Sequence, residues 1–124
     1  MKYVSTRNQS VRLRAGQAIA QGLARDGGLL TPEVFPKLTP ALLEDLRGKT
    51  YGQRAVAVMK LFLEDFSEED VTAFTQAGYS GEKFDDARVA PLEPLREDTY
   101  CLELWHGPTS AFKDMALQIL PHLL

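Results

Sequence analysis

The sequence predicts an α/β protein: a small, mostly helical N-terminal domain with a short sheet, followed by one strand and one helix of a second domain. Two observations carry this prediction. Amphipathic helical patterns with start and stop signals fill most of residues 12–78. A polar segment with two prolines, residues 81–94, then separates them from a strand pattern, a turn and a last helical pattern. We therefore expect a domain boundary between domains 1–94 and 95–124.

The N-terminal part is expected to combine a short strand with a helix. Lys2–Thr6 shows a brief strand alternation, and Arg12–Arg25 places apolar residues on one helical face and polar residues on the other. Asp26–Gly28 is expected to stop this helix, because glycine accepts the positive φ found at helix ends. Leu29–Leu30 is expected to be a short extended segment.

Three further helices have clear signals. Thr39 can cap a helix that begins at Pro40, and Ser67 can cap another that Gly78 closes. The strongest helical pattern lies between them, from Tyr51 to Phe66. The residues expected to face the core are Val56, Met59, Leu63 and Phe66 in this helix and Val71, Phe74 and Thr75 in the next.

The C-terminal part is expected to be a strand, a turn and a helix. Tyr100–Trp105 reads as the strand, His106–Ser110 as the turn, and the helix is expected from Ala111 to the end, with a kink at Pro121. The helix lacks a C-terminal cap and ends on two leucines, so we expect the rest of a larger α/β domain to be missing. The apolar surface left uncovered is expected to cause self-association.

The composition excludes several classes of function. Hydrophobic residues make up 44% of the chain and charged residues 25%, so a packed core is expected. The net charge of -3 favours neither nucleic acid nor an anionic membrane surface as a partner, and no apolar run is long enough to span a bilayer. The single cysteine, Cys101, fits a reducing cytoplasm. No metal site is predicted.

Lys113 is the candidate reactive residue. In a helix it shares a face with Ala116, Leu117 and Leu120, near the positive helix end. Burial there would favour the neutral, nucleophilic amine that a lysine needs in order to form an imine. The alternative is a lysine whose stem covers apolar surface while its charged head reaches water.

Three segments resemble the threonine synthase family. His106-Gly107-Pro108-Thr109-Ser110-Ala111-Phe112-Lys113-Asp114 is similar to the family's cofactor-lysine motif. Ser5-Thr6-Arg7 and Gly22-Leu23-Ala24-Arg25-Asp26-Gly27-Gly28-Leu29 are similar to its N-terminal motifs, in the family's order and at similar spacing. The likeness covers the whole chain.

The resemblance implies an enzyme that uses pyridoxal 5'-phosphate and has the fold-type II architecture shared with the tryptophan synthase β chain. Its reaction would convert O-phosphohomoserine and water to threonine and phosphate. It also implies that Lys113 binds the cofactor and moves protons, and that Phe112 packs near the cofactor. Thr109, Ser110 and His106 are candidates for substrate contact, although His106 could equally be structural. Thr109 or Ser110 could also cap the last helix. Asp114 is expected only to stabilise the first turn of that helix, through the interaction of its negative charge with the helix dipole.

The chain shows no glycine-rich phosphate loop, which the family carries downstream of the lysine, so we expect an inactive N-terminal fragment. Two alternatives stay open. One is a related fold-type II enzyme with another substrate, and the other is a non-catalytic binding or structural module.

Overall fold

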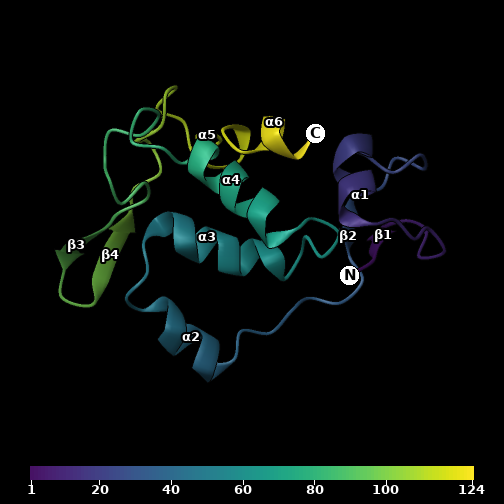
Figure 1. Cartoon of the computed structure of the whole chain (residues 1–124), viewed down its shortest axis with the longest axis horizontal. Coiled ribbons are helices and arrows are strands. Elements are labelled where there is room, and N and C mark those ends of the chain that lie inside the picture. Colours follow the sequence, from purple (N-terminus) through teal and green to yellow (C-terminus); the bar gives the residue numbers. More distant parts are fainter.

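The computed structural model describes residues 1–124. Figure 1 shows the helices α3 and α4 in the middle, a strand pair with α1 at one end, and a β-hairpin at the other. The elements in chain order are β1 (Tyr3–Ser5), α1 (Ala15–Gln21), β2 (Leu30–Pro32), α2 (Pro40–Leu46), α3 (Tyr51–Lys60), α4 (Glu68–Gly78), β3 (Leu92–Arg96), β4 (Thr99–Leu102), α5 (Asp114–Leu117) and α6 (Leu120–Leu123). This mixture confirms a small α/β protein. None of its helices combines the length and the apolar character needed to cross a membrane.

Two separate antiparallel strand pairs make up the β structure. β1 pairs with β2, with Val4 opposite Thr31, which confirms the two short extended segments expected near the N-terminus. β3 and β4 form a hairpin in which Glu93 lies opposite Cys101. The expectation of an irregular segment as far as residue 94 is therefore wrong, because β3 begins at Leu92. A boundary between residues 94 and 95 would fall inside β3, and the division into two domains stays a prediction.

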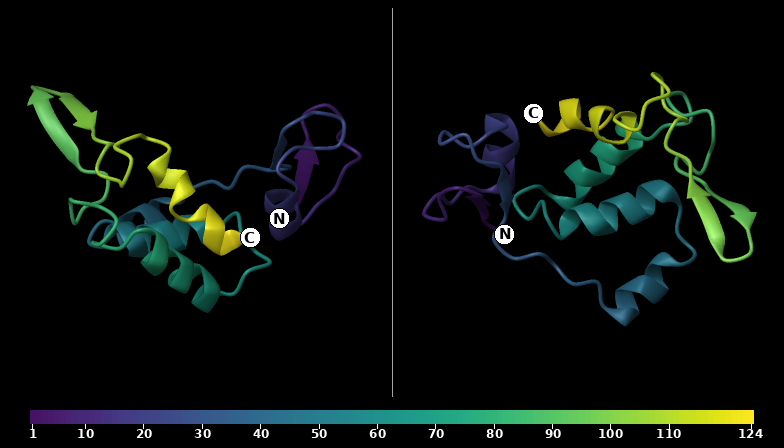
Figure 2. Two further views of the ribbon diagram at one scale, coloured as in Figure 1. Left: turned by 90° about the horizontal axis from the view of Figure 1, so that it is seen from above. Right: turned by 180° about the vertical axis from the view of Figure 1, so that it is seen from behind.

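The core lies where the N-terminal part meets the central helices. Ala15, Leu63 and Val71 form its buried centre. The partly buried residues packed against this centre are Tyr3, Ile19, Val56, Met59, Phe66 and Leu123. The inward face expected for residues 56–66 is thus confirmed. Figure 2 shows the C-terminal end of α6 lying near α1, in agreement with the place of Leu123 in this core.

Several helix starts follow the sequence signals. The Thr39 hydroxyl accepts a hydrogen bond from the Leu42 N–H at 3.2 Å, and the Ser67 hydroxyl accepts one from the Asp70 N–H at 3.0 Å. Each bond satisfies a backbone donor that has no partner inside the helix. Thr50 caps α3 in the same way, with a reciprocal bond from its own N–H to Gln53.

The helix ends differ more from expectation. α1 stops at Gly22, whose φ is +74°, and not at residues 26–28. α3 ends at Lys60 rather than Phe66, because the following residues form tight turns before Ser67. The expected last helix is two four-residue helices, α5 and α6, with Pro121 in the first turn of the second. The expected interruption at Pro121 is confirmed, since proline lacks the N–H that a continuous helix would use.

Candidate active site

An apolar groove of about 990 Å³ lies between α3, the β3–β4 hairpin and the segment around α5. Thirteen of the 15 residues that line it are hydrophobic. The lining side chains used below are Tyr79, Leu92, Leu102, Phe112, Lys113 and Leu117. Pockets of this size and character are typical of small-molecule sites and of surfaces that another polypeptide covers.

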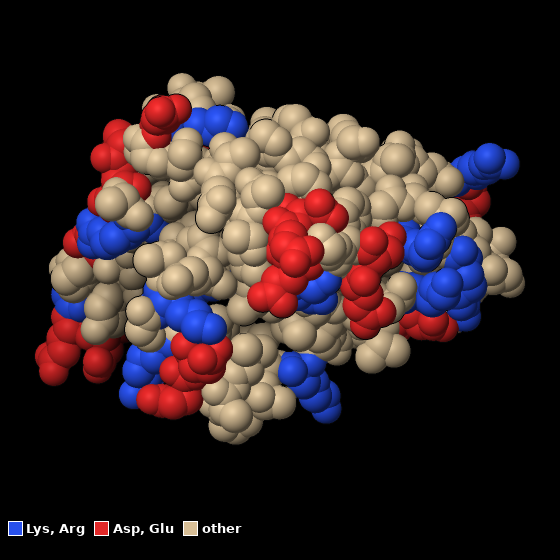
Figure 3. Space-filling view, in the orientation of Figure 1, with Lys and Arg blue, Asp and Glu red and all other residues tan.

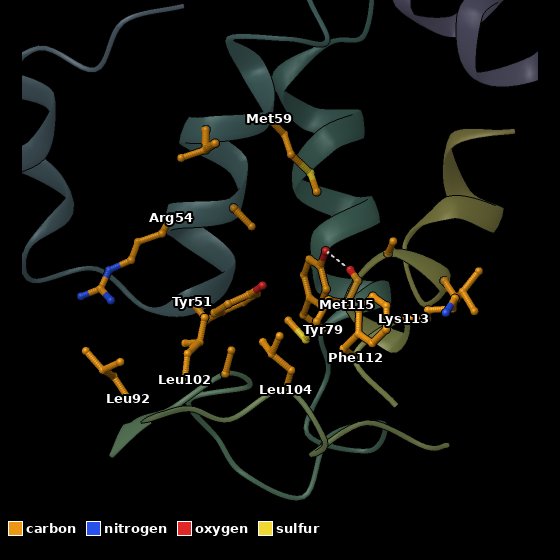
Figure 4. Close-up of a pocket in the computed structure, with 15 residues that line it drawn as sticks. Tyr51, Arg54, Met59, Tyr79, Leu92, Leu102, Leu104, Phe112, Lys113 and Met115 are labelled. Carbon is orange, nitrogen blue, oxygen red and sulfur yellow. Dashed lines mark hydrogen bonds between the residues drawn. The ribbon is translucent and has the colours of Figure 1, made fainter. Parts of the chain in front are cut away.

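Lys113 lies at the rim of this groove, immediately before α5. Figure 4 shows it on the opposite side of the Phe112 ring from Leu102. Its Nζ atom is 4.4 Å from the centre of the Phe112 ring, and both residues are exposed. Burial of Lys113, one of the two alternatives for this residue, is therefore not observed, and α5 begins at residue 114 rather than 111. The structure instead matches the alternative, in which the stem borders apolar surface and the amine reaches water.

Asp114 is the most deeply buried polar residue of this region. Asp114 has no exposed surface. Its Oδ2 atom accepts hydrogen bonds from the Thr109 N–H at 2.8 Å and from the Thr109 hydroxyl at 2.9 Å. Burial by itself raises the pKa of this carboxyl. The hydrogen bonds from Thr109 and Gln118 outweigh that effect and hold the pKa below its usual value. Asp114 was expected only to stabilise the helix start, but it also accepts the hydrogen bonds that join it to Thr109.

The turn between Gly107 and Lys113 is tight and exposed. The Ser110 N–H donates to the Gly107 carbonyl at 3.1 Å, and Ser110 itself has a φ of +56°, which is uncommon for a residue other than glycine. The first residue of α5 has no side-chain cap from Thr109 or Ser110, so that expectation is wrong. The Thr109 hydroxyl is used by Asp114, while the Ser110 hydroxyl makes no hydrogen bond within the chain.

His106 is held between two carboxylates. Its Nδ1 atom lies 2.5 Å from Asp85 and its Nε2 atom lies 2.7 Å from Glu103. Hydrogen bonding to Glu103 and then to Asp85 raises the pKa of His106 above its ordinary value of 6.5. The ring therefore ties the start of the turn to Asp85 and Glu103, which agrees with the structural alternative for this residue. No group of acidic, histidine and cysteine side chains has the arrangement of a metal site.

Tyr79 connects α4 to the segment that follows Lys113. Its hydroxyl donates to the Met115 carbonyl at 2.8 Å, drawn as a dashed line in Figure 4. Burial, with a smaller contribution from Tyr51, raises the pKa of Tyr79 to about 12, so the hydroxyl stays a donor at neutral pH. The Tyr51 ring packs edge-on against it, with ring centres 5.0 Å apart.

The two N-terminal motif segments meet each other, away from the lysine turn. The buried Ser5 hydroxyl donates to both Asp26 carboxylate oxygens, at 2.8 and 2.9 Å, and the Gly28 N–H donates to Asp26 at 2.9 Å. Arg7 donates to the Asp26 carbonyl. Figure 1 shows these segments beside α1, at the end opposite the β3–β4 hairpin.

The comparisons with known proteins place the chain in a family. The family described as the threonine synthase N terminus matches residues 2–79. A threonine synthase of Corynebacterium glutamicum is 39% identical over 99% of this chain and 27% of its own length. A crystal structure of threonine synthase from Brucella melitensis with bound pyridoxal phosphate has a TM-score of 0.92 and 40% identity, over 99% of this chain and 26% of that one. Threonine synthase-like 1 of Mus musculus is 39% identical over 86% of this chain and 15% of its own length.

This chain belongs to the threonine synthase N-terminal family, as the three motif segments predict. It spans about a quarter of the length of the threonine synthases that it matches. The structure brings four of the five predicted site residues, Thr109, Ser110, Phe112 and Lys113, into one turn, with His106 at its start. Their roles toward cofactor and substrate stay predictions.

Sequence reasoning missed the contribution of Asp114 to the turn. The only signal for it was an acidic residue next to the candidate lysine, which an exposed helix start explains equally well. It also missed Tyr79, because a tyrosine that follows the last helical residue resembles any partly buried aromatic side chain.

Proposed function

We propose that these residues form the N-terminal quarter of a threonine synthase, an enzyme that converts O-phosphohomoserine and water to threonine and phosphate with pyridoxal 5'-phosphate. The observation that carries the proposal is Lys113, presented with a free amine on its motif turn at the rim of the apolar groove. The relatives support it, since one of them contains the cofactor. The enzyme would be a lyase that acts on a phosphate ester, with fold-type II architecture in the remaining part.

The residues present suit the attachment of an aldehyde cofactor. Lys113 forms no ion pair and is exposed, so its amine is accessible, and Phe112 offers an aromatic ring beside it. When bound, pyridoxal phosphate supplies an electron sink for the reacting amino acid. Lys113 would hold it and carry protons, and Phe112 would exclude water from one side. A phosphate-binding loop would have to come from outside residues 1–124, because none of these residues forms one.

Of the three candidate residues, Ser110 is best suited to contact the substrate. Its hydroxyl is exposed and has no partner within the chain, whereas the Thr109 hydroxyl and both His106 ring nitrogens are already used. We propose that Ser110 donates to or accepts from the substrate, and that Thr109 and His106 act by shaping the turn.

We also propose that the 124-residue chain alone has no synthase activity and self-associates through its uncovered apolar surface. Only 15 of its 124 residues are buried, and Leu92, Leu102 and Leu117 in the groove are each about half exposed or more. Figure 3 shows a wide uncharged area on one face, over the region of α4 to α6, where Leu120 and Leu124 are also exposed. Turnover by the chain alone would refute the first statement. The proposed location is the cytoplasm.

A related enzyme with another substrate is the second candidate. Its support is the likeness to a threonine synthase-like protein, which has the same 39% identity as a threonine synthase. Identity at this level does not separate the two kinds of protein, so a functional test must decide.

The test is a hybrid enzyme. Residues 1–124 replace the matching 26% of the Brucella melitensis threonine synthase, and the release of phosphate and threonine from O-phosphohomoserine is measured. The proposal predicts activity that Lys113→Ala abolishes and that Lys37→Ala, at another exposed lysine, leaves intact. A hybrid that folds and binds pyridoxal phosphate without forming threonine would favour the second candidate. Activity that survives Lys113→Ala would refute the role of Lys113.

A further inference from the structure

The carboxylate of Asp114 is unusual because it is fully buried and yet faces no cation. Its partners are the N–H and hydroxyl of Thr109, which both reach the same oxygen, Oδ2. The Gln118 amide lies 3.5 Å from Oδ1, and the Ala111 N–H also contributes a hydrogen bond to this carboxylate. A buried carboxylate is unfavourable unless hydrogen bonds replace its hydration, and the two bonds from Thr109 are the shortest ones that this carboxylate accepts.

These bonds close the turn that carries Lys113. They join residues 109 and 114, whereas the other backbone bonds of this stretch each span only three residues: the Asp114 and Met115 N–H groups donate to the Ala111 and Phe112 carbonyls, at 3.0 and 3.2 Å. Within this closed turn Ser110 adopts its positive φ. Gly107 lies against the same carboxylate, where a methyl group would come within 2.5 Å of the Asp114 Cβ atom.

Lys113 directly precedes Asp114 in the chain. Its carbonyl accepts hydrogen bonds from the N–H groups of Ala116 and Leu117, at 3.0 and 2.8 Å, which fixes its backbone on the side of α5. The residues before it are held by short-range turn bonds, and the bonds from Thr109 to Asp114 join the two ends of this stretch. The direction in which the Lys113 amine leaves the turn therefore depends on the Asp114 carboxylate.

We propose that Asp114 is a positioning residue, which acts through Thr109 to set the conformation of the 107–113 turn and so the placement of the Lys113 amine beside the Phe112 ring. The functional meaning of this placement rests on the proposed function, but the placement itself does not. A carboxylate that served only the helix dipole would need neither complete burial nor two bonds to one threonine, and α5 has only four residues.

The test uses the 124-residue chain and needs no cofactor. In the native chain, the Lys113 εCH₂ protons should be shifted upfield by the Phe112 ring, and the Thr109 amide should exchange with solvent about tenfold more slowly than that of Phe112. The Lys113 shift should be lost in Asp114→Asn and in Thr109→Val, and the slow exchange of the residue 109 amide should be lost in Asp114→Asn, while thermal unfolding shows that the rest of the chain stays folded. Thr109→Ser, which keeps the hydroxyl, should retain the Lys113 shift.

Unchanged Lys113 and Thr109 signals in folded Asp114→Asn would overturn the proposal. If that variant does not fold, the matched pair Thr109→Val and Thr109→Ser decides, and equal Lys113 shifts in the two would overturn it as well. Reduction with borohydride in the presence of pyridoxal phosphate then separates this proposal from the preceding one. Unselective labelling of the native chain would count against Lys113 as the cofactor lysine, and it would leave the closure of the turn by Asp114 intact.

Discussion

Close packing around Asp114 determines what the motif turn tolerates at single positions. Gly107 is needed there for space, because its φ lies outside the positive range while Asp114 occupies the volume that a side chain would need. The glycine and the aspartate of the motif are therefore linked by packing as well as by their nearness in the chain.

Gly107→Ala should lower the free energy of unfolding by about 2 kcal/mol, because the added methyl group overlaps Asp114 and forces the turn to shift. Urea unfolding monitored by circular dichroism measures the change. Gly52→Ala is the matched control, since nothing lies within 4 Å of the added methyl group in the first turn of α3. The control should raise the stability by about 0.5 kcal/mol. Equal effects of the two substitutions would contradict the packing described at Gly107.

The His106 cluster predicts a dependence of stability on pH. The folded pKa of His106 is raised above 6.5 by Glu103 and Asp85, so its contribution is fully present below the unfolded pKa. That contribution is lost as the pH rises through the folded pKa. Stability of the native chain should therefore fall over this window relative to His106→Asn, in urea unfolding at a series of pH values. A difference between the two chains that does not vary with pH would contradict the ion pairs.

At the scale of secondary-structure elements, the start of each central helix depends on one hydroxyl. Ser67→Ala should destabilise the chain by about 1 kcal/mol, because the Asp70 N–H loses its acceptor at the start of α4. Ser67→Thr keeps the hydroxyl and should stay within about 0.5 kcal/mol of the native chain. Thermal or urea unfolding gives both values. A loss as large in Ser67→Thr as in Ser67→Ala would show that the hydroxyl is not the cause.

The elements that the sequence predicted well are those with local signals. Thr39, Ser67 and the apolar face of α3 depend on neighbours within a few residues, and the structure confirms them. The hairpin strand β3 was missed because Pro94 interrupts its pattern. A two-stranded sheet tolerates that proline, since each strand has one edge without a partner.

In the candidate site, too, features with local sequence signals could be predicted, and features that depend on contacts between separated residues could not. The motif residues could be found from the sequence because their identities and spacing are distinctive, and the N-terminal motifs indicated the family independently. The sequence left the exposure of Lys113 open as one of two alternatives, and the burial of Asp114 could not be found. Asp114 is bonded to Thr109, five residues earlier, and the helix begins three residues later than expected. Helical periodicity alone assumes that the helix has already begun.

At the scale of the whole molecule, the apolar groove is a large surface that the chain itself leaves uncovered. In light scattering, the apparent mass of the native chain should increase with concentration, because association would bury the apolar surface of the groove. Leu117→Glu, which places a charge in the groove, should reduce the increase. Leu43→Glu, at an equally exposed leucine of α2 outside the groove, should not. A single monomeric mass at all concentrations would contradict self-association.

We propose above that Lys113 is the residue that binds pyridoxal phosphate. The most direct measurement mixes the chain with pyridoxal phosphate, reduces with borohydride, digests, and locates the labelled lysine by mass spectrometry. Five other lysines compete with Lys113, so the readout is the selectivity of labelling. We expect Lys113 to be labelled in preference to the others, because its amine is exposed at the rim of an apolar groove beside an aromatic ring. Equal labelling of all six lysines, or none at Lys113, would contradict it.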